Sequence, residues 1–287
     1  MITLENEGFV ASIDIKGGEL HSFFSKTNGL EYLWNGDPEY WPRHTPVLFP
    51  IVGGLKDDSF LYNGQEYSLI KHGFARDMDF EVEEVSATAV TLVLKSNDET
   101  LKSYPFHFEL RHTYQLDDSR ITLTYEVSNP SENKMFFSLG AHPAFKVPLL
   151  QGTNYTDYYL EFEQKETSSQ WKINGNLIAE PVPFLNNEDK LPLKHDLFYQ
   201  DAIVFKDLKS ETITIRSDKT PHGLRYHFKG FPYMGIWAAK DAPFVCIEPW
   251  CGIADSVNHD KNLENKEGII ELPPLEKWRK STTMEIF

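Results

Sequence analysis

Residues 106–128 read FHFELRHTYQLDDSRITLTYEVS, and this stretch decides the expected fold. Apolar side chains alternate with polar ones on both sides of a short polar turn at 117–119: Phe106, Phe108, Leu110 and Tyr114 before it, and Ile121, Leu123, Tyr125 and Val127 after it. A period of two is the pattern of a β-strand with one buried face. Two such runs around a short turn predict an antiparallel hairpin.

The same alternation recurs along the chain, at 9–15, 158–162, 212–216 and 224–229. Asn-Gly pairs at 28–29, 63–64 and 174–175 each lie between β-like runs and predict tight hairpin turns, because these residues tolerate positive φ. Helical periodicity is scarce, and only short helical turns are expected, near 37–39 and 275–280. The longest loop-like stretch is 181–195, which mixes Asn, Asp, Pro and Lys.

The 287 residues contain no internal repeat, low-complexity tract or Gly/Ser linker, so we predict a single domain spanning 1–287. Many short strands with few helices can bury their faces only against one another. The sequence therefore predicts an all-β fold, a large antiparallel β-sandwich.

The formal net charge of −15 disfavours nucleic-acid and membrane partners, because such a chain repels phosphate backbones and anionic lipid surfaces. It also weakly disfavours strongly anionic substrates. Aromatic residues make up 14% of the chain, which suits β-strands and also a sugar site, where flat rings cover the apolar faces of pyranoses. A neutral small molecule is the expected ligand.

The chain has two cysteines, Cys246 and Cys251, and neither redox nor zinc spacing. The N-terminal residues lack a basic-then-apolar signal segment, and no stretch of about 18 apolar residues is present. We therefore expect a cytoplasmic protein with free thiols. The sequence contains no HExxH motif, so we predict no metal site. It also lacks the GxGxxG and GxxxxGK[ST] motifs of nucleotide-binding proteins and the GxSxG motif of serine hydrolases, which argues against a nucleotide cofactor and against serine hydrolysis.

Three segments interrupt the alternation and combine Gly or Pro with ionisable groups: KHGFAR at 71–76, GAHPAF at 140–145 and CIEPWCG at 246–252. Glu248 follows an apolar run, and burial there would raise its pKa and improve it as a base; a salt-bridged glutamate at a strand end is the equal alternative. His142 and His72 are candidates for proton transfer, with core histidines bonded to backbone carbonyls as the alternative.

Together and in this order, these segments resemble the aldose 1-epimerase family, especially its LacX-like bacterial branch. The resemblance covers nearly the whole chain and includes KGGEL at 16–20, PIVG at 50–53 and KEG at 266–268. It implies a galactose mutarotase-like supersandwich of antiparallel strands, with a sugar in an open groove. It requires no metal or organic cofactor.

The resemblance also implies roles for single residues. Glu248 would be the general base, His142 the general acid, and His72 would bind and polarise the sugar. Asp201 resembles a position that bonds sugar hydroxyls, and Arg76 could also serve the groove. Three aromatic residues could supply a stacking face, or pack in the core: Phe74, Phe145 and Trp250.

One departure from the family pattern concerns Gly54, because relatives usually carry an arginine there. Lys56 follows two residues later and would lie on the same side of a strand as residue 54. A lysine is not equivalent to an arginine there, because it lacks the planar, forked set of N–H donors. The leading hypothesis is mutarotation of a free aldohexose. Epimerisation of a hexose 6-phosphate is the alternative, with Lys56, Arg76 and Arg43 as its basic candidates. A non-catalytic sugar-binding or sensor protein, favoured by Gly54, is the third. We expect a monomer or homodimer.

Overall fold

The computed structural model describes all residues 1–287, and every pairing between its strands is antiparallel. The smaller of its two main sheets has the order β1 (Ile2–Glu5), β2 (Phe9–Asp14), β3 (Glu19–Ser25), β4 (Leu30–Glu31). The larger sheet has the order β5 (Val47–Leu48), β13 (Leu139–Ala141), β21 (Phe244–Cys251), β20 (Tyr233–Trp237), β17 (Ile203–Phe205), β15 (Tyr158–Asn174), β18 (Thr212–Ser217), β19 (Thr220–His227), β23 (Lys277–Ile286), β11 (Arg120–Ser128), β10 (Glu109–Asp117), β9 (Ala89–Lys95), β8 (Glu81–Val85).

Two strands pair beside this path, β14 (Ala144–Lys146) with β21 and β16 (Leu177–Pro192) with β15. Two further pairs are β6 (Ser59–Tyr62) with β7 (Gln65–Ser68), and β12 (Met135–Phe137) with β22 (Ile270–Leu272). Helices are short: α1 (Asp98–Ser103) and the 3₁₀ turns η1 (Lys56–Asp58), η2 (Ala75–Asp77), η3 (Tyr155–Asp157), η4 (His195–Phe198) and η5 (Leu263–Asn265). No helix is long and apolar enough to cross a membrane.

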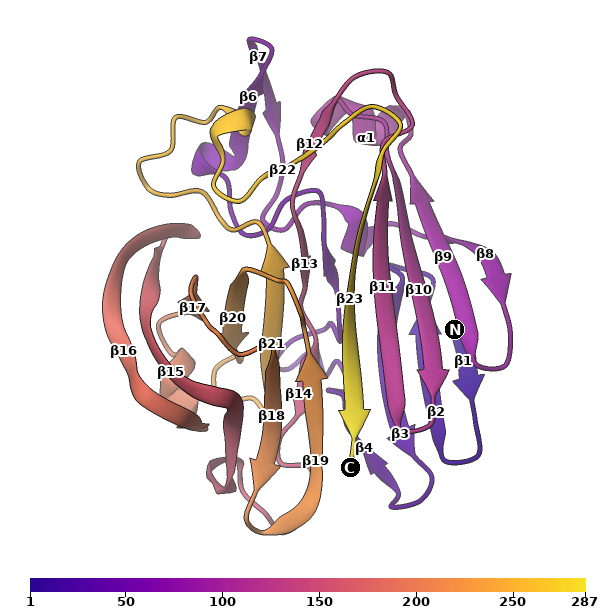
Figure 1. The fold of residues 1–287 in the computed structure, drawn as a ribbon, viewed down its shortest axis with the longest axis vertical. Helices are drawn as coiled ribbons and strands as arrows, with labels where there is room; N and C mark the ends of the chain where they lie inside the picture. Colours follow the sequence, from indigo (N-terminus) through magenta and orange to yellow (C-terminus); the bar gives the residue numbers. More distant parts are fainter.

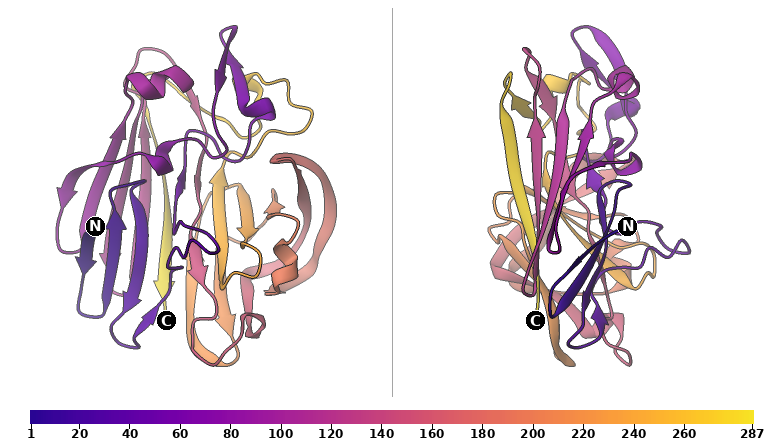
Figure 2. Two further views of the ribbon diagram at one scale, coloured as in Figure 1. Left: turned by 180° about the vertical axis from the view of Figure 1, so that it is seen from behind. Right: turned by 90° about the vertical axis from the view of Figure 1, so that its right-hand side faces the viewer.

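The two main sheets pack face to face as the two layers of a sandwich. Figure 2 shows the β1–β4 sheet lying over the part of the large sheet formed by β8–β11 and β23. Side chains from both layers are fully buried between them, among them Leu4 and Phe23 from one sheet and Leu110 and Tyr125 from the other. The Tyr114 hydroxyl also donates to the Gly18 carbonyl, 2.8 Å away. The predicted all-β antiparallel sandwich is confirmed.

The predicted hairpin around residues 117–119 is β10 and β11, whose paired residues run from Glu109 opposite Ser128 to Asp117 opposite Arg120. Asn63 and Gly64 both have positive φ and join β6 to β7 in a two-residue turn, as predicted. At the third Asn-Gly pair the turn residues are Gly175 and Asn176, with φ of 58° and 73°, because Asn174 still pairs with Leu177.

Two local predictions are wrong. Residues 181–192, expected as loop, belong to β16, which pairs only with β15. An edge strand tolerates prolines because one side of its backbone needs no hydrogen-bond partner, and bulges interrupt this pair. Residues 277–280, expected in a helical turn, begin β23, because pairing with β11 outweighs weak local helix propensity.

The β15–β16 hairpin forms a long curved arm at one edge of the molecule (Figure 1). Its tip returns toward the large sheet, where the Ile178 N–H donates to the Asp255 carbonyl at 2.8 Å and the Val257 N–H donates to the Ile178 carbonyl at 3.0 Å. This contact places residues of the turn beside the segment that follows β21.

Candidate active site

Glu248 lies on β21, a fully buried strand between β13 and β14 on one side and β20 on the other. Because side chains alternate along a strand, Cys246, Glu248 and Trp250 share one face. Only 2% of Glu248 is exposed, and no backbone N–H donates to its carboxyl group. The predicted base is therefore a buried carboxyl with few polar neighbours.

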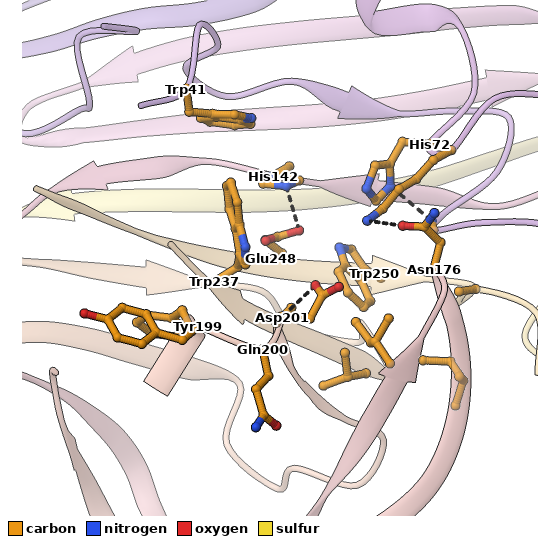
Figure 3. Close-up of a pocket in the computed structure, with 18 of the residues that line it drawn as sticks. Trp41, His72, His142, Asn176, Tyr199, Gln200, Asp201, Trp237, Glu248 and Trp250 are labelled. Atoms are coloured by element: carbon orange, nitrogen blue, oxygen red, sulfur yellow. Dashed lines mark hydrogen bonds and ion pairs between the residues drawn. The ribbon is translucent and has the colours of Figure 1, made fainter. Parts of the chain in front are cut away.

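His142 is placed opposite Glu248 by a gap between two short strands. Gly140 of β13 pairs with Trp250 and Ala144 of β14 pairs with Cys246, so the intervening residues face the middle of β21. His142 Nε2 lies 3.2 Å from Glu248 Oε2 (Figure 3). The structure thus brings the predicted acid and base into direct contact.

His72 is held by the segment around Gly53. The His72 N–H donates to the Gly53 carbonyl at 2.9 Å, and the Gly53 N–H donates to His72 Nδ1 at 3.0 Å. Since Nδ1 accepts, the proton of the neutral ring is on Nε2, which is free to donate. Gly73 must be glycine, because a Cβ there would lie 2.3 Å from the Phe49 carbonyl oxygen.

Burial controls the charge of this group. It raises the pKa of Glu248 to about 8, with Asp201 adding to the rise and Lys71 opposing it. Burial likewise lowers the pKa of His142 to about 3, and nearby cations add to this. The pKa of His72 falls well below its ordinary value, again chiefly through burial and then through repulsion by His142. Near neutral pH, the His142–Glu248 pair therefore holds one shared proton and no net charge.

Aromatic rings enclose His142. The Trp41 ring stacks on the imidazole, with centroids 4.9 Å apart and planes 25° apart. Trp237 meets it edge-on at 5.7 Å, and His72 does so at 5.8 Å (Figure 3). These contacts exclude water from most of the ring and so account for its depressed pKa.

The pair faces a pocket of about 510 Å³. Six residues predicted from the sequence line it: Glu248, His142, His72, Arg76, Asp201 and Trp250. The buried Trp250 indole N–H makes no hydrogen bond of good geometry, although it lies near enough to the Glu248 carboxyl to lower its pKa. Arg76 Nη2 donates to the Lys71 carbonyl at 2.8 Å, while Asp201 Oδ1 accepts the Ala202 N–H at 2.7 Å.

Three residues expected to contact the ligand lie outside the pocket. Lys56 Nζ donates to the His259 carbonyl at 2.9 Å, which directs the side chain away. Phe145 is fully buried and packs against Tyr226, and Phe74 packs in the aromatic core beside Phe49 and Phe108. Alternation explains Phe145, because β14 turns this ring to the core side of the sheet.

Sequence reasoning missed several lining residues, notably Trp41, Lys71, Asn176, Tyr199 and Trp237. Lys71 adjoins the motif at 72–76 and could have been included by its charge. Asn176 arrives at the tip of the β15–β16 arm, where Lys71 Nζ donates to its Oδ1 at 3.1 Å (Figure 3). Trp41 comes from a loop that the Trp34 indole N–H holds by donating to the Trp41 carbonyl, and its ring packs against two residues distant in the sequence, Trp237 and Phe244. No local pattern marks these two positions.

Two clusters bring potential metal ligands together: His142, Cys246 and Glu248; and Glu19, His21 and His44. In the first, burial raises the pKa of Cys246 well above its ordinary value, and a metal needs the thiolate. In the second, the two imidazoles stack with centroids 3.8 Å apart and planes 14° apart. The lone pair of an imidazole nitrogen lies in the plane of its ring. Two stacked rings therefore cannot both direct a lone pair at one ion unless the rings rotate.

Known proteins resemble this chain over its whole length. The sequence pattern of the aldose 1-epimerase family matches residues 1–285. The plasmid-encoded LacX protein of Lactococcus lactis subsp. lactis is 39% identical over 296 residues, covering 99% of each chain.

Two solved structures share the fold over the whole chain. A galactose mutarotase related enzyme from Lactobacillus acidophilus is 35% identical, with a TM-score of 0.95 over 100% of this chain and 97% of that one. A galactose mutarotase-like protein from Lactobacillus casei is 34% identical, with a TM-score of 0.90 over 100% of both. The resemblance found in the sequence is confirmed: the chain belongs to the aldose 1-epimerase family.

Proposed function

We propose that this protein is an aldose 1-epimerase that interconverts the α and β anomers of a free aldohexose. Family membership supports a mutarotase-like enzyme. The observation that carries the proposal is the contact of 3.2 Å between His142 and Glu248 on the wall of a pocket large enough for a hexose. Mutarotation needs one group that takes a proton from the C1 hydroxyl and one that gives a proton to the ring oxygen.

A single shared proton serves both needs. When the C1–O5 unit of the sugar lies against this pair, with O1 beside Glu248 and O5 beside His142, the shared proton moves to His142 and Glu248 becomes a carboxylate. Glu248 takes the O1 proton while His142 protonates O5, and the C1–O5 bond breaks to give the open-chain aldehyde. C1 then rotates about its bond to C2. On closure O5 attacks C1, His142 takes back the O5 proton, and Glu248 returns a proton to O1.

The remaining lining residues position the sugar. His72 donates from Nε2 to a sugar oxygen, because its Nδ1 is already occupied by the Gly53 N–H. Asp201 accepts from sugar hydroxyls with its second carboxylate oxygen. The Trp250 indole N–H, buried without a hydrogen bond of good geometry, is a further donor toward the pocket.

One observation favours the hexose 6-phosphate alternative, namely that Lys71 lines the pocket without a carboxylate partner. The other basic candidates give it less support. Lys56 is outside the pocket, and Arg43 donates to Asp77 at 2.8 Å. Only Lys71 and Arg76 remain for a phosphate, so the free sugar is the preferred substrate. Parallel rates on glucose and glucose 6-phosphate decide between them.

Polarimetry of freshly dissolved α-glucose and α-galactose tests the proposal. The protein should accelerate the loss of α anomer, and Glu248→Gln should reduce the acceleration by roughly 10²–10⁴-fold. Glu166→Gln is the matched control, because Glu166 is also fully buried but lies outside the pocket. Binding of sugar without any acceleration would identify the non-catalytic alternative instead.

A further inference from the structure

Asp255 and Lys266 form an ion pair inside the protein. Lys266 Nζ donates to Asp255 Oδ1 at 2.7 Å, and only 1% of either side chain is exposed. Neither residue lines the pocket. Burying two charges costs free energy, and well-packed apolar side chains in their place are often at least as stable. Stability alone therefore does not explain the pair, and its other hydrogen bonds indicate what else it does.

Asp255 holds the segment after Gly53 at two points. Its N–H donates to the Gly54 carbonyl at 3.0 Å, and its Oδ2 accepts the Lys56 N–H at 2.9 Å. Gly53 in turn bonds His72 twice, through its carbonyl at 2.9 Å and through its N–H at 3.0 Å. A displacement of this segment would therefore be passed to the His72 ring.

A second connection runs through the tip of the β15–β16 arm. The Asp255 carbonyl accepts the Ile178 N–H at 2.8 Å. Two residues before Ile178, Asn176 Oδ1 accepts from Lys71 Nζ at 3.1 Å (Figure 3). Lys71 and His72 are adjacent and both line the pocket. Two separate chains of hydrogen bonds thus join Asp255 to the same part of the pocket wall.

The contacts of the Asp255 carboxylate fix its orientation. Each oxygen has a donor of its own, the Lys266 ammonium for Oδ1 and the Lys56 N–H for Oδ2. The Lys56 side chain turns back to the same cluster, because its Nζ donates to the His259 carbonyl at 2.9 Å. His259 Nε2 lies 3.6 Å from Asp255 Oδ1. The ion pair therefore directs the second oxygen at the segment that supports His72.

We propose that Asp255 is a positioning residue for the reaction, and that its ion pair with Lys266 fixes the carboxylate that holds Lys71 and His72 at the pocket wall. The inference rests on the proposed function and adds to it a residue that touches no substrate. Since His72 binds the sugar, its displacement should chiefly raise KM.

Two double variants without charge separate position from stability. Asp255→Asn/Lys266→Gln replaces the ion pair by two amides that can bond each other, while the Asn oxygen still accepts the Lys56 N–H. Asp255→Leu/Lys266→Met fills the space with apolar side chains and leaves the Lys56 N–H without its acceptor. Urea denaturation establishes that each variant is folded before its kinetics are measured.

Mutarotation of α-glucose and α-galactose is then followed at several sugar concentrations to give kcat and KM. The amide pair should keep most of kcat/KM. The apolar pair should lose roughly tenfold, mainly through KM, which is the size of one hydrogen bond to the sugar. A wild-type KM in the folded apolar pair would overturn the inference, as would an equal loss in both double variants.

Glu166→Gln is the matched control. Glu166 is also fully buried and also accepts backbone N–H groups, those of Lys209 and Ser210, but it does not line the pocket. Its substitution should lower stability and leave KM unchanged. This control separates a loss of stability from a displacement of the pocket wall.

Loss of the proposed function would look different. If the wild-type protein converts no sugar, NMR signals of the His72 imidazole still decide the inference, because Nδ1 accepts the Gly53 N–H whether or not a sugar reacts. These signals should shift in the apolar pair and keep their wild-type positions in the amide pair and in Glu166→Gln. Unchanged His72 signals in the apolar pair would refute the positioning role.

Discussion

Glu248→Gln should make the protein more stable at neutral and alkaline pH while it removes most of the activity. The folded protein holds this carboxyl in a dry site, which raises its pKa from an ordinary value of 4.5 to about 8. Between these pH values the unfolded chain has lost a proton that the folded protein retains. Stability therefore falls as pH rises through this window.

The structure sets the magnitude of this effect. Each pH unit between 4.5 and 8 costs about 1.4 kcal/mol of unfolding free energy. The cost reaches about 3 kcal/mol at pH 7 and about 4 kcal/mol at pH 8. Glutamine keeps the shape of the side chain and cannot ionise, so the variant escapes the cost. The lowered pKa of His142 makes stability rise with pH between about 3 and 6.5. This contribution is present in both proteins, so it cancels in the comparison.

Urea denaturation at pH 5, 7 and 8 measures the difference. The two proteins should be similar at pH 5, and the variant should be the more stable by several kcal/mol at pH 8. Glu166→Gln is an informative contrast, because that buried carboxylate accepts from the Lys209 and Ser210 N–H groups and the Ser210 hydroxyl. It should destabilise at all three pH values. Equal pH dependence of wild type and Glu248→Gln would refute the reasoning.

Three further predictions follow from the same geometry. Because the His142–Glu248 pair needs one shared proton, kcat/KM should be flat from pH 5 to 7 and fall above about pH 8; a rise through pH 6 to 7 in the pH–rate profile would contradict this. Trp41→Ala should admit water to His142 and lower kcat roughly tenfold with a smaller change in KM, whereas Trp41→Phe should retain most activity; equal losses in steady-state kinetics would contradict the packing role. Gly54→Ala should cost about 1–3 kcal/mol of stability in urea denaturation, because its Cβ would lie 2.8 Å from the Asn176 carbonyl oxygen, and an unchanged midpoint would contradict this.

The parts of the fold with local signals were predictable. The β10–β11 hairpin follows from alternation that holds on both sides of one turn, so its register could be read from the sequence. The β16 strand was missed because an edge strand with bulges keeps polar residues and prolines that a central strand would reject. Its identity as a strand depends on pairing with β15, which no local pattern reveals.

The candidate site divides in the same way. Glu248 lies on β21 and His142 lies between β13 and β14, and the pairing of these strands brings the two residues together. Both residues stand in motifs that the sequence shows directly, so the sequence could identify them. Trp41 and Asn176 reach the pocket through a loop and a long arm, whose positions depend on contacts with distant segments. The structure also explains why residue 54 is a glycine: the tip of the β15–β16 arm packs directly against it and leaves no room for a side chain.

A double-mutant cycle in mutarotation tests the shared-proton pair most directly. Rates of α-to-β exchange are measured for wild type, His142→Asn, Glu248→Gln and the double variant. Since neither group works without the other, each single variant should lose nearly as much rate as the double variant. Single losses that multiply to give the double loss, or single variants that retain wild-type exchange, would contradict joint proton transfer by His142 and Glu248.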